Sequence, residues 1–206
     1  MTRSLVIGGT TRSGKSTLAR RLAGEFGLPR LSGDSLIFAF GSAFPALNIR
    51  HEQPQPVTAA NMAPFVTEYW SRLLAEDDSP GFIYDSFHLL PSCLPLDQLR
   101  EKLGFVFMGY PRIEVEDLLV RLRSQKEEKG WTSRCTDDQL RPALADMIAI
   151  SQRLESECQQ YNLPFFDVSR SWEEGGLAAY CYIAEQLDPS RKPANVSSFV
   201  NKFVPK

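Results

Sequence analysis

A short segment near the start of the chain, residues 9–16, combines two glycines with a lysine and a terminal hydroxyl side chain. Its order, GTTRSGKS, fits the pattern G-x-x-x-x-G-K-[ST] at every fixed position, after an apolar run and before a stretch of helical spacing. Such a segment lets backbone N–H groups close around phosphates, and the helix N-terminus adds partial positive charge. We expect Lys15 to reach the β- and γ-phosphates of a nucleotide and Ser16 to ligate Mg²⁺. The residues predicted to hold the nucleotide are Gly9, Thr10, Thr11, Arg12, Ser13, Gly14, Lys15, Ser16 and Thr17.

Two aspartates stand where strand candidates end. Asp34 follows the short strand candidate at 29–32, and Asp85 follows the apolar run at 82–84. In open parallel sheets the ligand crevice lies at the carboxyl ends of the strands, and a carboxylate there holds Mg²⁺ or orients an acceptor hydroxyl. We expect Asp34 to orient or deprotonate the acceptor. Asp85 is expected to share Mg²⁺ with Ser16 and to border the acceptor. The alternative for each aspartate is a helix N-cap or a turn.

The two motifs that a GTPase switch needs are not met. Asp78-Ser79-Pro80-Gly81 has the letters of DxxG, but it precedes the apolar run at 82–84, where it cannot sense a γ-phosphate. The NKxD motif for guanine is incomplete, because residues 201–204 are Asn-Lys-Phe-Val. The sequence therefore predicts ATP with Mg²⁺ as the ligand.

The elements that must position these residues alternate along the chain. Apolar and β-branched runs predict strands at 4–8, 29–32, 81–84, 105–108 and 163–168. Helical periodicity predicts helices at 15–26, 62–74, 96–103, 114–128, 137–161 and 171–187, with Gly27 ending the first and Asp137 capping the fifth. Residues 41–60, rich in proline, are expected to form a loop or mobile insert. This alternation favours an α/β fold with a parallel sheet covered by helices on both faces.

Length and charge limit the number of domains and the kind of partner. The chain has 206 residues, with Lys+Arg 23 against Asp+Glu 25 and a net charge of -2. This suits one domain over 1–187, with an acceptor segment near 36–76, a lid near 121–136 and a tail at 188–206. No broad basic face for nucleic acid is expected. No stretch approaches the ~20 apolar residues of a membrane span, and the four cysteines form no CxxC pair, so we expect a cytoplasmic protein without a membrane partner.

Several segments carry a family resemblance. They are GGTTRSGKSTLARRLA at 8–23, LSGDSL at 31–36, YDSFHLLP at 84–91, FMGYPR at 107–112 and FFDVS at 165–169. On these segments the chain resembles the small P-loop kinases related to adenylate, shikimate, gluconate and nucleoside kinases, and more closely the 2-phosphoglycerate-kinase-like group. The resemblance implies a three-layer P-loop NTPase fold with strand order 2-3-1-4-5, a mobile acceptor segment and an arginine-bearing lid. It also implies that Asp34 contacts the acceptor hydroxyl. Where relatives often carry Glu-Gly after the third strand, this chain has Asp85-Ser86, which leaves the acceptor open.

Cations beyond the phosphate loop are candidates for the lid. We expect Arg121, Arg123 and Arg134 to neutralise charge on the migrating phosphoryl group, together with Lys126. The alternative is that they complement a helix dipole.

On the acceptor side, Arg50 and His88 are predicted to bind substrate, although a lone histidine is often structural. Phe38 and Phe40 belong either to the acceptor wall or to the core. The turn at 169–171 is expected near the adenine.

The sequence therefore predicts an ATP- and Mg²⁺-dependent kinase that phosphorylates a hydroxyl or phosphate of a small-molecule acceptor, as a monomer or homodimer. One alternative is a nucleoside or nucleotide kinase, whose acceptor pocket would stack a base. Another is a non-catalytic ATP-binding regulatory module. In the tail, apolar residues recur at helical spacing and predict a short docked helix, with Val196, Phe199, Val200, Phe203 and Val204 on one face.

Overall fold

The sheet has five parallel strands. The structure is a computed structural model that describes residues 4–76, 79–124 and 131–188. The strands are β1 (Leu5–Gly9), β2 (Arg30–Ser32), β3 (Ile83–Ser86), β4 (Gly104–Gly109) and β5 (Phe165–Asp167). Their order is β2-β3-β1-β4-β5, and every neighbouring pair is parallel, so the predicted fold class and strand order are confirmed. All five carboxyl ends therefore meet at one edge of the sheet.

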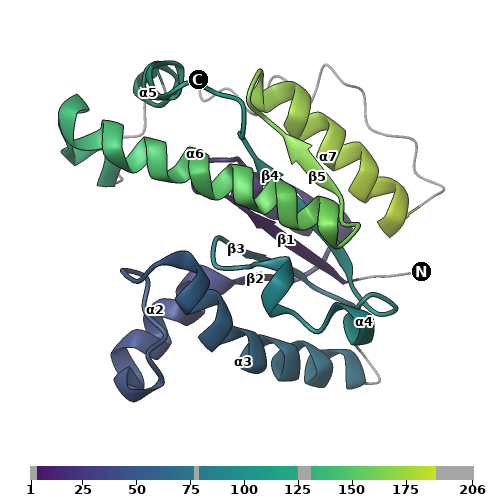
Figure 1. Cartoon of the computed structure of the whole chain (residues 1–206). Helices are drawn as coiled ribbons and strands as arrows, with labels where there is room; N and C mark the ends of the chain where they lie inside the picture. The colour runs from purple at the N-terminus through teal and green to yellow at the C-terminus, as the bar shows by residue number, and fades with distance from the viewer. Residues whose placement is uncertain (1–3, 77–78, 125–130, 189–206) are drawn as a thin grey trace.

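Helices cover both faces of this sheet (Figure 1). They are α1 (Lys15–Phe26), α2 (Gly33–Ala43), α3 (Gln55–Ala75), α4 (Leu96–Leu99), α5 (Val115–Ser124), α6 (Asp137–Gln160) and α7 (Trp172–Leu187). Three short 3-10 turns, Pro45–Leu47, Pro91–Cys93 and Trp131–Arg134, lie between them.

Alternation along the strands builds a core on each side of the sheet. In β1, Ile7 faces the core that includes α1, α5 and α7, whereas Val6 faces the core that includes α3 and α4. The long helix α6 contributes to both, with Leu144 in the first core and Leu154 in the second. Figure 1 shows α3 and α7 on opposite sides of the sheet. The central strand β1, which leads into the phosphate loop, is fully buried.

Three local predictions differ from the structure. The loop predicted over 41–60 is wrong in part, because α2 extends to Ala43 and α3 already begins at Gln55, with a proline in its first turn where the missing N–H costs nothing. The N-cap of α6 is Thr136 rather than Asp137, since the Thr136 side chain accepts from the Gln139 N–H and the Gln139 side chain accepts from the Thr136 N–H. The helix predicted at 96–103 is shorter in the structure, where α4 ends at Leu99.

Some predictions fall outside the described residues. These are the tail stripe at 196–204 and Lys126. Among the helices of the described ranges, none is long and apolar enough to cross a membrane.

Candidate nucleotide and acceptor site

The phosphate loop is folded tightly against β4. Gly9 has φ 154°, and a Cβ atom there would lie 2.4 Å from the Met108 carbonyl oxygen, so only glycine fits this close approach. The Thr10 N–H donates to the same carbonyl at 3.0 Å. The Tyr110 hydroxyl, at the end of β4, donates to the Thr11 carbonyl at 2.5 Å. Burial raises the pKa of Tyr110 and keeps it a neutral donor. Two contacts with β4 therefore set the loop in place before any ligand binds.

Lys15 is the buried cation of the site. Lys15 is the first residue of α1 and is 6% exposed. Burial lowers the pKa of Lys15, while the charges of Asp34 and Asp85 oppose that shift. No side chain or carbonyl of the described residues forms a hydrogen bond with its ammonium group. An ammonium group without a hydrogen-bonding partner at the start of a helix suits a phosphate oxygen as its ligand.

Ser16 and Asp85 lie together as predicted for a shared Mg²⁺. The Ser16 hydroxyl donates to Asp85 Oδ2 at 2.7 Å. A hydroxyl and a carboxylate oxygen are the hard ligands that Mg²⁺ takes, with phosphate oxygens and waters completing the octahedron. The described residues hold no group of three or more His, Cys, Asp or Glu that could bind a metal by themselves. The site therefore fits a metal that arrives with a nucleotide.

Asp85 has a second partner that the sequence did not indicate. Arg30 Nε lies 2.7 Å from Asp85 Oδ1, and Arg30 Nη2 donates to Oδ2 at 3.0 Å. The parallel register that sets Ser32 beside Asp85 brings the long Arg30 side chain within reach. The pair places a positive charge against a carboxylate that is only 2% exposed.

Asp34 lies in the first turn of α2, with Ser32 as the N-cap of that helix. Its Oδ1 accepts from the Ser86 hydroxyl and from the Phe87 N–H, both at 3.2 Å. The other carboxylate oxygen, Oδ2, has no hydrogen bond within the described residues. The carboxylate is thus oriented by the end of β3, partly exposed, and close enough to Lys15 to act on its charge.

His88 lies beside Asp34, and Arg50 does not. The His88 ring is buried, with Nδ1 4.0 Å from Asp34 Oδ1. Burial and the neighbouring His51 lower the pKa of His88 to about 4, so its ring is neutral near pH 7. The Arg50 side chain is exposed, and no hydrogen bond or ion pair joins it to Asp34 or His88 among the described residues.

The predicted lid arginines have different surroundings. Arg121 donates to the carbonyls of Val168, Ser169 and Arg170 and lies 5.2 Å from the Trp172 ring, so it anchors the turn after β5. That turn, at 169–171, is the one expected near the adenine.

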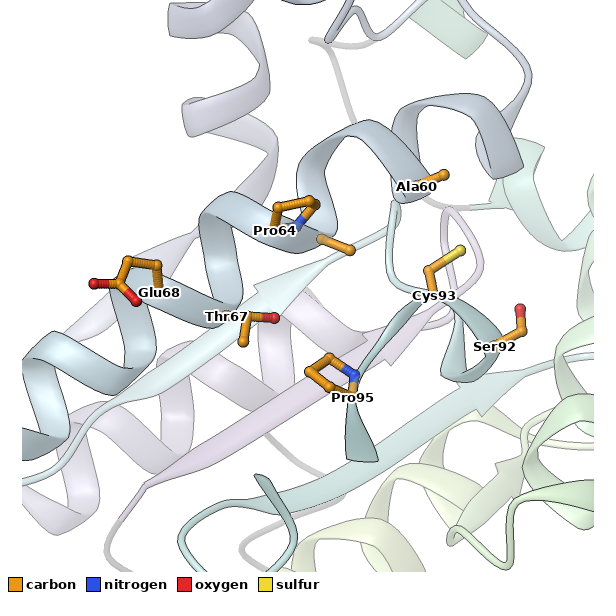
Figure 2. A pocket seen from close by; sticks show the side chains of 8 residues that line it. Ala60, Pro64, Thr67, Glu68, Ser92, Cys93 and Pro95 are labelled. Atoms are coloured by element: carbon orange, nitrogen blue, oxygen red, sulfur yellow. The ribbon is translucent and has the colours of Figure 1, made fainter. Parts of the chain in front are cut away.

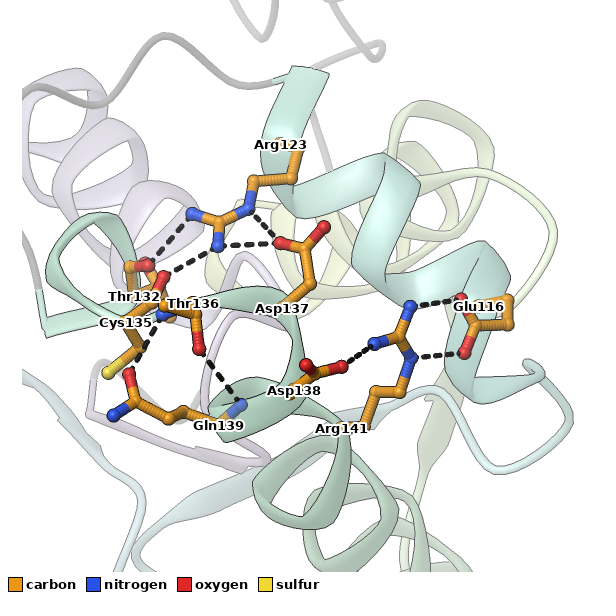
Figure 3. A network of polar contacts seen from close by, with 9 residues as sticks. All are labelled: Glu116, Arg123, Thr132, Cys135, Thr136, Asp137, Asp138, Gln139 and Arg141. Atoms are coloured by element: carbon orange, nitrogen blue, oxygen red, sulfur yellow. Dashed lines mark hydrogen bonds and ion pairs between the residues drawn. The ribbon is translucent and has the colours of Figure 1, made fainter.

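The second lid arginine, Arg123, is held in the polar network of Figure 3. It pairs with Asp137 at 2.8 Å and donates to the Thr132 and Cys135 carbonyls. Arg134 is exposed. Arg12, in the phosphate loop, donates to the Thr132 hydroxyl at 3.0 Å and so joins the loop to the 3-10 turn Trp131–Arg134. The roles of these arginines in phosphoryl transfer stay predictions.

A separate cavity of about 510 Å³ opens between α3 and the segment after β3 (Figure 2). It is lined by Ala60, Ala63, Pro64, Thr67, Glu68, Ser92, Cys93 and Pro95. None of the predicted site residues borders it. Burial raises the pKa of the Cys93 thiol, which therefore stays protonated near neutral pH.

The comparisons with known proteins identify the fold. No family model matches the chain, and neither does any curated protein. Among solved structures, a gluconokinase from Sinorhizobium meliloti 1021 is 21% identical, with a TM-score of 0.51 over 92% of this chain and 97% of that one. A shikimate kinase from Bacteroides thetaiotaomicron is 17% identical, with a TM-score of 0.52 over 90% and 98%. A sugar kinase from Janibacter sp. HTCC2649 is 19% identical, with a TM-score of 0.54 over 92% and 98%. The chain therefore has the fold of the P-loop small-molecule kinases.

Proposed function

We propose that the chain is an ATP- and Mg²⁺-dependent kinase that transfers the γ-phosphoryl group to a hydroxyl or phosphate of a small-molecule acceptor. The observation that carries the proposal is the position of Lys15 at the end of the phosphate loop, where its ammonium group has no hydrogen-bonding partner among the described residues and lies within the electrostatic reach of Asp34 and Asp85. A cation so placed suits the phosphates of a nucleotide. A cytoplasmic location, where ATP and Mg²⁺ are available, is part of this proposal.

Each residue then has a role in transfer to a hydroxyl. The loop amides and Lys15 bind the β- and γ-phosphates, and Ser16 with Asp85 would hold Mg²⁺, which when bound neutralises phosphate charge. Asp34 receives the acceptor proton as the acceptor oxygen bonds to the γ-phosphorus. The bond from that phosphorus to the bridging oxygen breaks, and ADP leaves. Among the predicted lid arginines we assign the approach to the phosphoryl group to Arg134, because Arg121 and Arg123 already bind carbonyl groups.

The test is turnover with a set of acceptors. The protein is incubated with ATP, Mg²⁺ and a library of small hydroxylated and phosphorylated compounds, and acceptor-dependent ADP release is followed. Tight ATP binding without any acceptor-dependent turnover would contradict the proposal and favour a non-catalytic nucleotide-binding module.

Asp34→Asn is the matched variant for this assay. The amide oxygen still accepts from Ser86 and Phe87, so the local structure is kept. A neutral amide cannot take a proton, so we expect kcat to fall by roughly 10²- to 10⁴-fold while ATP affinity is unchanged.

A further inference from the structure

Four rings form a continuous row beside Asp34. Phe38 of α2 stacks on His51, with centroids 4.9 Å apart and planes 18° apart. His51 meets the edge of His88 at 5.0 Å, and His88 meets the edge of Phe87 at 4.7 Å. Phe38 is 56% exposed and His88 is 2% exposed. The row therefore leads from the surface of the molecule down to the carboxylate that is proposed to take the acceptor proton.

His88 has polar atoms that nothing in the described residues satisfies. Neither Nδ1 nor Nε2 of its ring has a hydrogen-bond partner there, although the ring is buried. A buried polar atom without a partner is unfavourable, so such atoms in a ligand site are usually completed by the ligand. A neutral imidazole offers one donor and one acceptor. A hydroxyl group, which also both donates and accepts, matches that pattern.

The charges around the row disfavour an acidic acceptor. The titratable groups that act on His88 are His51, Asp34 and Lys15. Lys15 is the cation proposed to bind the nucleotide phosphates, and Arg30 is already held across both oxygens of Asp85. A carboxylate beside His88 would thus meet the Asp34 carboxylate and a neutral ring, and no guanidinium is among the described charged groups that act on His88.

The stretch from α2 to the start of α3 exposes several apolar side chains. Most of the large hydrophobic side chains that are exposed in the described residues belong to the stretch from α2 to the start of α3, namely Phe38, Phe44, Leu47 and Val57. Small-molecule sites combine such apolar walls with a few fixed polar groups. The stretch therefore suits a ligand that presents a carbon face to the rings and hydroxyls to His88 and Asp34.

We infer that His88 is a specificity-determining residue and that the acceptor is a neutral polyhydroxylated compound of the sugar or polyol class. One of its hydroxyls pairs with the His88 ring, another lies at Asp34, and its carbon face packs on Phe38 and His51. This inference rests on the proposed kinase function and adds to it the chemical class of the acceptor.

Acceptors that differ in one chemical group test the proposed class of acceptor. Glucitol and gluconate share a carbon skeleton and differ by one carboxylate, and uridine adds a base that could stack on the rings. With ATP and Mg²⁺, we expect kcat/KM for glucitol or glucose to exceed that for gluconate and uridine by at least about tenfold. Preference for gluconate or uridine would overturn the inference and leave the kinase function standing. No turnover with any compound, with ATP binding retained, would contradict both.

Two variants test His88 itself. His88→Phe keeps a ring but removes both nitrogens, whereas His88→Gln keeps a donor and an acceptor. We expect His88→Phe to weaken binding of the preferred neutral acceptor by roughly 10- to 100-fold in calorimetry with a non-hydrolysable ATP analogue, and His88→Gln to restore much of it. The KM for ATP is expected to stay constant in both. Val120→Ala, on the exposed face of α5, is the surface control. Equal acceptor affinity of His88→Phe and the wild type would overturn the assignment of His88.

Discussion

The Arg30 guanidinium spans both oxygens of the Asp85 carboxylate, with Nε 2.7 Å from Oδ1 and Nη2 3.0 Å from Oδ2. Ser16 donates to the same carboxylate at 2.7 Å. The Arg30 guanidinium on β2 thus orients the Asp85 carboxylate on β3, and this carboxylate faces Ser16 at the start of α1. The geometry of the candidate metal site depends on a side chain outside the phosphate loop.

Arg30→Gln is expected to destabilise the protein by about 3 kcal/mol. The substitution leaves Asp85 buried and without its main countercharge, and breaking one partner of a buried pair costs roughly 3–5 kcal/mol. Because Arg30 is 25% exposed, the lower end applies. Urea unfolding measures the loss. In a double-mutant cycle with Asp85→Asn, the combined loss should be smaller than the sum of the single losses, and simple additivity would show that the pair is not coupled.

Lys15→Met is expected to abolish turnover without unfolding the chain. Methionine keeps most of the length of the side chain and removes an amino group whose pKa is lowered by burial. We expect a loss of at least about 10²-fold in kcat and a free energy of unfolding within about 1 kcal/mol of the wild type. Coupled detection of ADP and thermal unfolding check the two parts. Unchanged activity would remove Lys15 from the mechanism.

Arg121→Ala and Arg134→Ala are expected to differ in kind. Arg121 binds carbonyls of Val168 and Ser169 and lies over Trp172, so its loss should cost about 2 kcal/mol of stability and raise the KM for ATP. Arg134→Ala should leave the unfolding midpoint unchanged and lower kcat. Urea unfolding with steady-state kinetics on both variants measures these effects. Equal midpoints for the two variants would contradict the anchoring role of Arg121.

Protonation of His88 at low pH should lower the free energy of unfolding. Its pKa of about 4 in the folded protein lies below the ordinary value of 6.5, so the unfolded chain binds the proton more readily. Stability from this group is therefore complete above about pH 6.5 and falls as the pH drops toward 4, by about 2 kcal/mol between pH 7 and pH 5. His88→Asn should remove that part of the slope in urea unfolding curves. Parallel slopes for the two proteins would contradict the buried, neutral state of the ring.

The local signals in the sequence predicted much of the fold. The phosphate loop and α1 were predictable because the glycines, the lysine and the stop at Gly27 act over a few residues. The helix α2 was missed, since Ile37 is its one buried large side chain while Phe38 is exposed, which hides the helical period. The start of α3 was missed because prolines there suggested a loop.

The partners within the site were less predictable than its members. Ser16 and Asp85 were predicted as a pair and Asp34 and His88 one by one, and the structure brings the four together. The fork from Arg30 to Asp85 depends on the register of β2 against β3, which no local pattern encodes. The hydrogen bond from Tyr110 to the phosphate loop joins residues 99 apart in the sequence, and no sequence pattern around either residue indicates it.

The order of the strands has a consequence for local opening. The strand that leads into Lys15 is central and pairs on both sides, whereas the strand that leads into Asp34 is a three-residue edge strand. Backbone amides in the centre of a sheet exchange with solvent only through global unfolding, and edge segments exchange through smaller fluctuations. The acceptor half of the crevice can therefore fluctuate open while the nucleotide half stays folded. Hydrogen exchange would show this as slow amides at Val6 and Ile7 and faster ones at Leu31 and Ser32.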